Sequence, residues 1–280
     1  MIIYWIKEPA GGLGDRIVGL VSAMFLARAT RRQLEICWEW PNIDTCVDYL
    51  HTPLPEQHAQ MNARDKEFKF KAMWAEDNLN DIMANPDMFT LTCNQNIGQY
   101  LWQNPHYKGV FGDYLEEHLL AYKAVFRHYL RPRMETSYPE VGIQVRVGDC
   151  AMGLTPHVAQ TGEQALEMLK AAAPHCKGRS VFLTTDCAEV VDAAREVIGN
   201  FQYHEAEITH IDKDPTEAGT YKAFYDMLTL SRCDTLIFTD ASNFGRVPAL
   251  MGGGELLAWD GDSLRTPDLK ALTSKEPVVV

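Results

Sequence analysis

An arginine and an aspartate near the middle of the chain have the residue types and spacing of an anion-binding site. They stand in Val-Gly-Ile-Gln-Val-Arg-Val-Gly-Asp, where Arg146 and Asp149 close an alternating apolar segment. The alternation over residues 141–147 predicts a half-buried strand, and ligands bind at the carboxyl ends of strands in open α/β sheets. A guanidinium can donate two parallel hydrogen bonds to a diphosphate, so Arg146 is a candidate binding residue. A structural salt bridge between Arg146 and Asp149 is the alternative.

A glycine-rich turn near the start of the chain is a second candidate. Gly-Gly-Leu-Gly-Asp-Arg, residues 11–16, follows an apolar segment and opens a segment of helical periodicity. Backbone N–H groups at such a turn can face an anion, which makes Gly12, Gly14 and Arg16 candidates. The turn is no dinucleotide fingerprint, because Ile17 stands at the third glycine position, and no P-loop, because no Gly-Lys-Ser/Thr follows. The alternative is a turn that only permits tight packing of the helix on the strand.

Two further polar turns lie between predicted strands and helices. Asp186 ends Thr-Thr-Asp, where it either caps the following helix or lies at the ligand-binding rim. The second turn holds Ser242 and Asn243, which are good N-caps, and the N–H groups beside them could hold phosphate oxygens. Arg246 falls in the first turn of that helix, where a cation is unfavourable unless an anion lies nearby. This turn therefore also indicates phosphate binding.

Several acidic residues could bind a base or a metal. Asp226 interrupts a mostly apolar helix, either as part of a solvated face or as a functional group. Asp-Lys-Asp at 212–214 and Asp-Gly-Asp at 260–262 match the triplets that bind Mg²⁺ or Mn²⁺ in some sugar transferases, although a turn is the simpler explanation of both. The nine histidines show no metal-ligand spacing. We therefore expect no metal cofactor.

The elements that must position these residues alternate between strand and helix. The elements predicted in the first half are strands at 2–6, 34–38 and 89–93, a helix after the glycine turn, short helices near 79–83 and a helix at 114–130. Residues 41–112 are otherwise irregular in composition. The strands predicted in the second half are 141–147, 181–185, 201–204, 235–239 and 256–259, and the helices are 162–173, 188–198, 218–231 and 243–251.

This order predicts a parallel, doubly wound α/β architecture. Pro132 marks a boundary, so we expect two Rossmann-like lobes with a cleft between them, at residues 1–135 and 136–280. The acidic net charge of −12 disfavours nucleic acid and anionic membranes as partners. Neither a signal peptide nor an apolar run of ~18 residues is visible. The seven scattered cysteines, without Cys-x-x-Cys, indicate reduced thiols and a cytoplasmic location.

Four motifs in order resemble the α1,6-fucosyltransferase-like superfamily, which includes the nodulation fucosyltransferases, the core fucosyltransferases and the protein O-fucosyltransferases. The glycine turn is similar to the family's Gly-Gly-Leu-Gly-Asn-Arg-Leu. Residues 144–149 resemble its His-x-Arg-x-x-Asp, and residues 181–186 resemble its Val-Phe-x-x-Thr-Asp. The segment from Asp226 through Arg246 resembles its Asp-x-x-x-Leu-Ser-x-Ala-Asp…Ser-x-Phe-x-Arg. The resemblance spans most of residues 10–250 and leaves the middle of the first lobe unmatched.

The resemblance implies an inverting, metal-independent GT-B glycosyltransferase. Its first lobe would bind an oligosaccharide or glycoconjugate acceptor, and its second lobe a GDP- or UDP-linked sugar. Arg146 would hold the donor diphosphate, Asp226 the base, and the turn at 242–244 a phosphate. Asp149 is the first candidate for the general base that takes the acceptor proton, and Asp15 is the second. The candidate donor-binding residues are Gly12, Gly14, Arg16, Gln144, Asp186, Asp226, Ser242, Asn243, Phe244 and Arg246.

Two departures from the family motifs leave the donor open. The motif histidine, which in relatives helps to recognise the guanine nucleotide, is Gln144 here, and Asp15 replaces an asparagine. GDP-fucose and UDP-xylose are therefore both candidate donors. One alternative is a non-catalytic glycan-binding protein of the same fold. A sugar-nucleotide reductase or epimerase is less favoured, because the dinucleotide loop is broken and no Tyr-x-x-x-Lys pair occurs.

Overall fold

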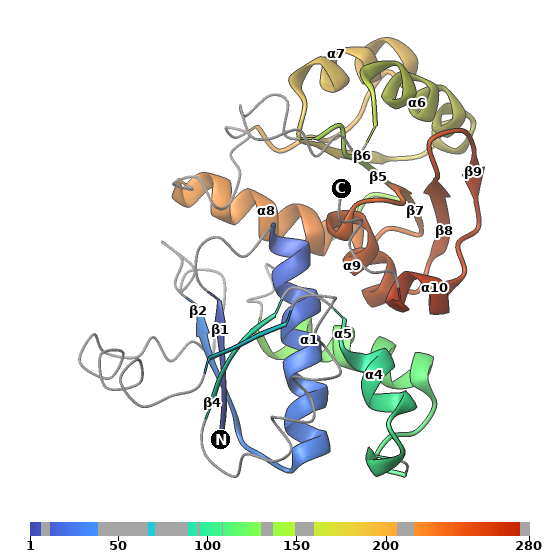
Figure 1. The fold of residues 1–280 in the computed structure, drawn as a ribbon. Helices are drawn as coiled ribbons and strands as arrows, with labels where there is room; N and C mark the ends of the chain where they lie inside the picture. Colours follow the sequence, from blue (N-terminus) through green and yellow to red (C-terminus); the bar gives the residue numbers. More distant parts are fainter. Residues whose placement is uncertain are drawn as a thin grey trace. The chain divides into compact units, whose positions relative to one another are not determined.

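The protein contains two α/β units, each built on its own sheet. The computed structural model describes residues 1–6, 12–38, 67–70, 89–93, 96–107, 109–129, 137–148, 160–205 and 216–274. Contacts divide the chain into Met1–Arg131 with Thr273–Pro277, and Pro132–Leu272 with Val278–Val280. Parallel pairing dominates both sheets, and helices pack against them (Figure 1). The predicted α/β fold class is confirmed.

The sheet of the first unit has the strand order β2-β1-β4-β3, and every pair in it is parallel. Its strands are β1 (Ile2–Ile6), β2 (Leu34–Trp38), β3 (Glu67–Phe70) and β4 (Phe89–Cys93). The strands predicted at 2–6, 34–38 and 89–93 are thus confirmed. Strand β3 escapes sequence reasoning because its four residues are too few to establish a period. The helices predicted near 79–83 lie outside the described residues.

Helix α1 (Leu13–Thr30) packs against the sheet of the first unit. Its small residues Gly19, Ala23 and Ala27 are all buried, and a row without bulky side chains lets a helix lie close to its neighbours. The other helices of the unit are α4 (Gly98–Gln103), the 3₁₀ turn η3 (Pro105–Tyr107) and α5 (Tyr114–Tyr129). The helix predicted at 114–130 is confirmed to within one residue.

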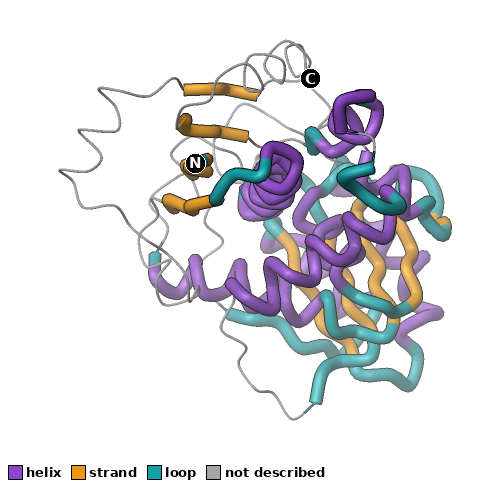
Figure 2. The backbone as a smooth tube through the Cα atoms, turned by 90° about the horizontal axis from the view of Figure 1, so that it is seen from below, coloured by secondary structure: helices purple, strands orange, loops and turns teal. Residues whose placement is uncertain are grey.

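The sheet of the second unit has the order β6-β5-β7-β8-β9, in which only the last pair is antiparallel. Its strands are β5 (Val141–Val145), β6 (Val181–Thr185), β7 (Thr235–Thr239), β8 (Glu255–Trp259) and β9 (Leu264–Arg265). The helices of this half are α6 (Gly162–Cys176), α7 (Ala188–Val197), α8 (Glu217–Leu230), α9 (Asn243–Met251) and α10 (Leu269–Ser274). Helices α6 and α7 cover one face of the sheet, and α8 and α9 cover the other. Figure 2 shows helices (purple) on both sides of these strands (orange).

Strand β5 is buried at every position, so the prediction of a half-buried strand is wrong. Its apolar positions 141, 143 and 145 pack into the core formed with α6 and α7. The alternate positions, Gly142 and Gln144, face the ends of α8 and α9 instead of water. The alternation therefore distinguishes two buried faces, because a central strand of a doubly wound sheet meets helices on both sides.

The other elements predicted in this half agree with the structure except at one place. Most ends coincide with the prediction, others shift by a residue or two, and α6 continues through Pro174 to Cys176. The strand predicted at 201–204 is wrong, because Gln202 forms only an isolated bridge with Phe182 and no strand extends from it. An alternating run of aromatic and polar residues resembles a strand, but His204 packs its ring on Phe182 at 4.9 Å instead of extending the ladder.

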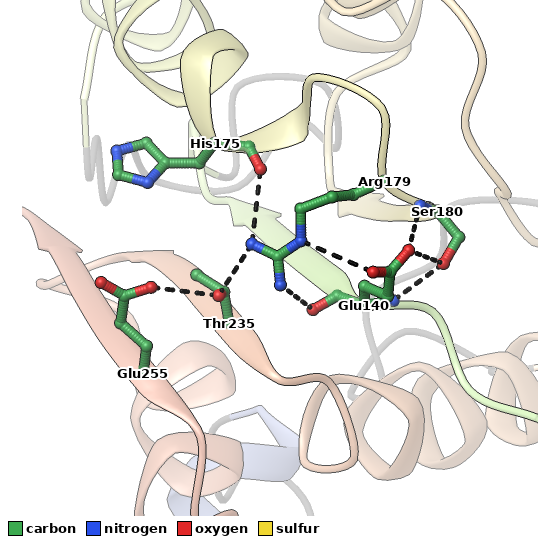
Figure 3. A network of polar contacts seen from close by, with 6 residues as sticks. All are labelled: Glu140, His175, Arg179, Ser180, Thr235 and Glu255. Atoms are coloured by element: carbon green, nitrogen blue, oxygen red, sulfur yellow. Dashed lines mark hydrogen bonds and ion pairs between the residues drawn. The ribbon is translucent and has the colours of Figure 1, made fainter.

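A polar network joins the strand starts at the amino edge of the second sheet (Figure 3). Arg179 donates through Nη1 to Thr235 Oγ1 at 3.1 Å and through Nη2 to the Glu140 carbonyl oxygen at 3.2 Å. The Glu140 carboxylate accepts from the backbone N–H of Ser180 at 2.9 Å and from its hydroxyl at 3.1 Å. Thr235 Oγ1 also lies 3.2 Å from Glu255 Oε2, to which it donates. The network therefore links the amino ends of β5, β6, β7 and β8.

Two compositional expectations can be compared with the described residues. Cys176, Cys187 and Cys233 form no disulfide within the described residues, two of them are buried, and the reduced state of the thiols stays a prediction. Within the described ranges, no helix combines the length and apolarity needed to cross a membrane.

Candidate functional site

The carboxyl ends of β5 and β6 bring two predicted site residues into contact. Arg146 follows β5, and its Nη1 lies 3.0 Å from Oδ2 of Asp186, which follows β6. The arginine side chain is 26% exposed, whereas the aspartate side chain is only 8% exposed. A buried carboxylate therefore orients the guanidinium, and the exposed part of the guanidinium can meet an anionic ligand. The alternative partner, Asp149, lies outside the described residues.

Asp186 also fixes the backbone that follows Arg146. Its Oδ1 accepts from the N–H of Val147 at 2.8 Å, and its Oδ2 accepts from the N–H of Gly148 at 2.9 Å. Gly148 has a φ of 129°, a conformation that residues with a Cβ rarely adopt. Asp186 does not cap the next helix, because the N-cap of α7 is Cys187. Of the two interpretations of Asp186, the structure favours the one that places it beside Arg146.

Two residues at this edge escape sequence reasoning. Thr239 Oγ1, at the end of β7, accepts from the N–H of Arg146 at 3.0 Å and from Gln160 Nε2 at 3.3 Å. Gln160 is buried, and its Oε1 has no hydrogen-bond partner in the described part of the chain. These contacts join residues 93 and 79 positions apart in the sequence. No local spacing could have revealed them.

Gln144, at the histidine position of the motif that residues 144–149 resemble, lies buried on β5 against the start of α9. Its Nε2 donates to the hydroxyl of Ser242, the N-cap of α9, at 3.3 Å. Its Oε1 is buried without a partner among the described residues. Gly245 makes room for this amide, because a Cβ there would lie 2.6 Å from Gln144 Oε1 and 2.7 Å from Phe238 Cβ. Gln144 is therefore fixed by the first turn of α9.

The same turn of α9 also holds Arg246. This residue is buried, its Nε donates to the carbonyl oxygen of Asp240 at 2.6 Å, and the same Nε lies 3.9 Å from Asp240 Oδ1. Arg265 Nη2 pairs with Asp240 Oδ2 at 3.1 Å. Asp240 therefore offsets the cation at this helix start, and the sequence reasoning overlooked it. Asn243 and Phe244 are partly exposed at the turn, where the leading N–H groups of a helix have no intrahelical acceptor.

Asp226 is not part of a solvated helix face, so that interpretation is wrong. Its side chain is 2% exposed. Its Oδ2 accepts from Thr184 Oγ1 at 2.7 Å and from Lys222 Nζ at 2.5 Å, and its Oδ1 lies 2.5 Å from His204 Nδ1. Lys222 lies one helical turn from Asp226, whereas Thr184 and His204 come from the β6 region. Neither Lys222 nor His204 was identified from the sequence.

The glycine turn of the first unit begins helix α1. Gly12 is the N-cap, and its N–H donates to Asp15 Oδ2 at 3.1 Å. Gly14 is buried, and so is the side chain of Arg16, whose carbonyl oxygen accepts from Tyr4 Oη at 3.0 Å. These contacts support the packing interpretation of the turn. The binding roles of Gly12, Gly14 and Arg16, and the catalytic role of Asp15, remain predictions.

The Asp-Gly-Asp triplet at 260–262 forms a turn, as the simpler explanation predicted. Asp260 Oδ1 accepts from the N–H groups of Asp262 at 3.1 Å and Ser263 at 3.0 Å. These two hydrogen bonds lower the pKa of Asp260 below its ordinary value. The triplet at 212–214 lies outside the described residues. Elsewhere in the described chain, no three His, Cys, Asp or Glu side chains gather so as to hold a metal ion.

The fold is that of the GT-B class, and solved structures of fucosyltransferases share it. A mutant of Arabidopsis thaliana FUT1 in complex with GDP matches with a TM-score of 0.62 at 17% identity, over 100% of this chain and 80% of that one. Fucosyltransferase NodZ from Bradyrhizobium matches with a TM-score of 0.55 at 18% identity, over 96% and 98%. NodZ soaked with GDP-fucose gives 0.54 at 17% identity, over 95% and 98%. No protein-family model and no curated protein matches the chain.

Proposed function

We propose that the protein is a glycosyltransferase that binds a nucleotide-sugar donor on its second unit and transfers the sugar to a glycan or glycoconjugate acceptor. The observation that carries this proposal is Arg146, a partly exposed cation held by buried Asp186 at the carboxyl edge of a parallel sheet. Ligands bind at this edge in open α/β folds. FUT1 with GDP and NodZ with GDP-fucose share the fold, which supports a donor of that kind.

In the proposed reaction, Arg146 stabilises the leaving diphosphate. Glycosyl transfer builds negative charge on the diphosphate, and a fixed cation stabilises that charge without reorganising during the reaction. The N–H groups at the start of α9, near Asn243 and Phe244, provide additional donors for phosphate oxygens. These donors could balance the charge of the diphosphate without a metal ion, which supports the proposal of metal-independent transfer.

The acceptor hydroxyl needs a carboxylate to take its proton, and the proposed transfer inverts the anomeric centre. Asp149 is the proposed general base, because it follows Arg146 closely in the sequence. Asp15 is the weaker candidate, since its carboxylate already accepts from the N–H of Gly12. The first unit would bind the acceptor.

GDP-fucose is the proposed donor, on the strength of the nucleotides bound by FUT1 and NodZ. UDP-xylose is the second candidate. The observation that favours it is Gln144, whose amide is fixed against Ser242 where the relatives have a histidine.

A donor panel tests the proposal. The intact protein is titrated calorimetrically with GDP-fucose, GDP-mannose, UDP-xylose, UDP-glucose and UDP-galactose, and donor hydrolysis is followed in excess EDTA. We expect one nucleotide class to bind selectively and to be hydrolysed slowly. Strict dependence on Mn²⁺ would contradict metal independence. Failure to bind any donor would overturn the proposed function and leave a non-catalytic glycan-binding protein as the better description.

A further inference from the structure

The Asp226 carboxylate is surrounded by its own chain. Each of its oxygens already accepts at least one short hydrogen bond, from Thr184, Lys222 or His204, and its side chain is 2% exposed. A buried carboxylate in this state has little capacity left for a ligand. Asp226 can therefore influence a ligand only through a neighbouring side chain that it holds in place.

His204 is the neighbour that reaches solvent. Its side chain is 32% exposed, and its Nδ1 is held at 2.5 Å by Asp226. Its ring lies 4.9 Å from that of Phe182 and 4.3 Å from that of Tyr225. Its other ring nitrogen, Nε2, forms no hydrogen bond within the described residues. The imidazole is therefore fixed in orientation, with one nitrogen left for a ligand.

The contact with Asp226 determines which nitrogen of the imidazole can accept. A carboxylate oxygen can only accept, so the hydrogen shared between His204 Nδ1 and Asp226 Oδ1 at 2.5 Å is donated by Nδ1. When the Nδ1–H of a neutral histidine donates to a carboxylate, its Nε2 must be an acceptor. His204 thus offers one directed acceptor beside aromatic rings.

The cluster also lies where a ligand is expected. Thr184, which anchors Asp226, is near the carboxyl end of β6, two residues before the Asp186 that holds Arg146. Tyr225 stacks with Tyr221 at 5.8 Å along α8, and both tyrosines are partly exposed. Aromatic rings of this kind provide stacking surfaces for flat heterocycles.

We propose that His204 reads the donor nucleobase, with its Nε2 accepting from the ring N–H of guanine or uracil while the base stacks on the tyrosines of α8. In this arrangement Asp226 and Lys222 are positioning residues that act through the imidazole. The inference rests on the proposed function, because it requires a nucleotide donor, and it assigns base recognition to a residue outside the four sequence motifs.

Nucleotides methylated at the ring nitrogen test the contact directly. Calorimetry compares GDP with N1-methyl-GDP, and UDP with N3-methyl-UDP, for the intact protein, for His204→Phe and for the control His175→Phe. His175 lies at the amino edge of the sheet, beside Arg179 (Figure 3). We expect methylation to weaken binding to the wild type and the control about tenfold, as for the loss of one good hydrogen bond. We expect equal affinities for the two nucleotides in His204→Phe.

A second measurement tests the positioning role. Long-range ¹H–¹⁵N correlation spectra should show the Nδ1–H tautomer of His204 in the wild type and a shift toward the Nε2–H tautomer in Asp226→Asn. An unchanged tautomer would overturn the role of Asp226. If the wild type binds nucleotides but His204→Phe retains the full methylation effect, the inference fails while the proposed function stands. If the wild type binds no nucleotide, both fail.

Discussion

Arg146 and Asp186 contribute differently to the candidate site. Arg146 supplies charge that a ligand can reach, whereas Asp186 fixes that charge and also binds the backbone N–H groups of Val147 and Gly148. Replacing Arg146 should therefore affect chemistry more than folding. Replacing Asp186 should disturb both the guanidinium and the turn.

Arg146→Ala should lower kcat/KM about 10²–10³-fold, which corresponds to losing one preorganised donor to a developing anion. Thermal unfolding should change little, because the side chain is partly exposed. The matched control is Arg195→Ala, which removes an exposed arginine paired with Asp192 on the surface of α7. Steady-state kinetics would contradict the diphosphate role if Arg146→Ala kept more than about a tenth of wild-type activity.

Gln144→His should shift nucleotide preference toward GDP. An imidazole of similar size would place the histidine of the resembled motif beside Ser242 and replace an amide oxygen that has no partner among the described residues. We expect the ratio of GDP to UDP affinity to rise about tenfold, the scale of a single polar contact. Calorimetric titration of both nucleotides measures this ratio, and an unchanged ratio would show that the nucleotide preference lies elsewhere.

Among the secondary elements, α9 packs closely on β5 and β7 through Gly245. The close approach of Gly245 to Gln144 and Phe238 leaves no room for a side chain. The packing of the helix therefore also sets the position of the candidate specificity residue.

Gly245→Ala should destabilise the second unit by about 1–3 kcal/mol, the usual cost of overpacking a buried contact. The matched control is Gly253→Ala, since a Cβ at Gly253 would meet nothing within 4 Å. Urea unfolding of the two variants measures the difference. Equal urea midpoints for the two variants would mean that α9 shifts to accommodate the added methyl group with no loss of stability.

Strands β5, β6, β7 and β8 could be predicted because they are short apolar runs bounded by helical segments, whereas the two residues of β9 are too few to establish a pattern. The residues that follow them, Arg146 and Asp186, could be predicted because the strand ends mark the site. Thr239, Lys222 and His204 could not, because their roles arise from contacts across the sheet or from an imidazole in a segment that resembles a strand. Sequence periodicity reports which face is buried but not which polar groups meet there.

At the scale of the whole molecule, the two units should respond differently to pH. His118 is fully buried in the first unit, where its Nδ1–H donates to the Tyr114 carbonyl oxygen at 2.7 Å and its ring lies 4.6 Å from that of Phe25. Burial lowers the pKa of His118 from 6.5 to about 4. The unfolded chain therefore binds more protons than the folded chain between these two values.

As the pH falls from about 6.5 to 4, the first unit should lose up to about 3 kcal/mol of stability through His118. Denaturant unfolding at several pH values should show this loss in the wild type. The variant His118→Phe lacks the titrating group and should have a shallower slope in the same window. Parallel slopes would show that His118 does not control the acid sensitivity of this unit.

The Glu140–Arg179 network has a consequence for how the protein can change. It fastens four strands at the end of the sheet that lies away from Arg146. The partly exposed positions at the opposite edge, which are 146, 147, 187, 243 and 244, can thus accumulate substitutions while the sheet keeps its anchorage. Libraries confined to these positions should give folded variants with altered donor choice, whereas libraries that include the anchored end should lose most members to misfolding. The positions that can vary therefore lie at one edge of the sheet, and the contacts that stabilise the sheet lie at the other.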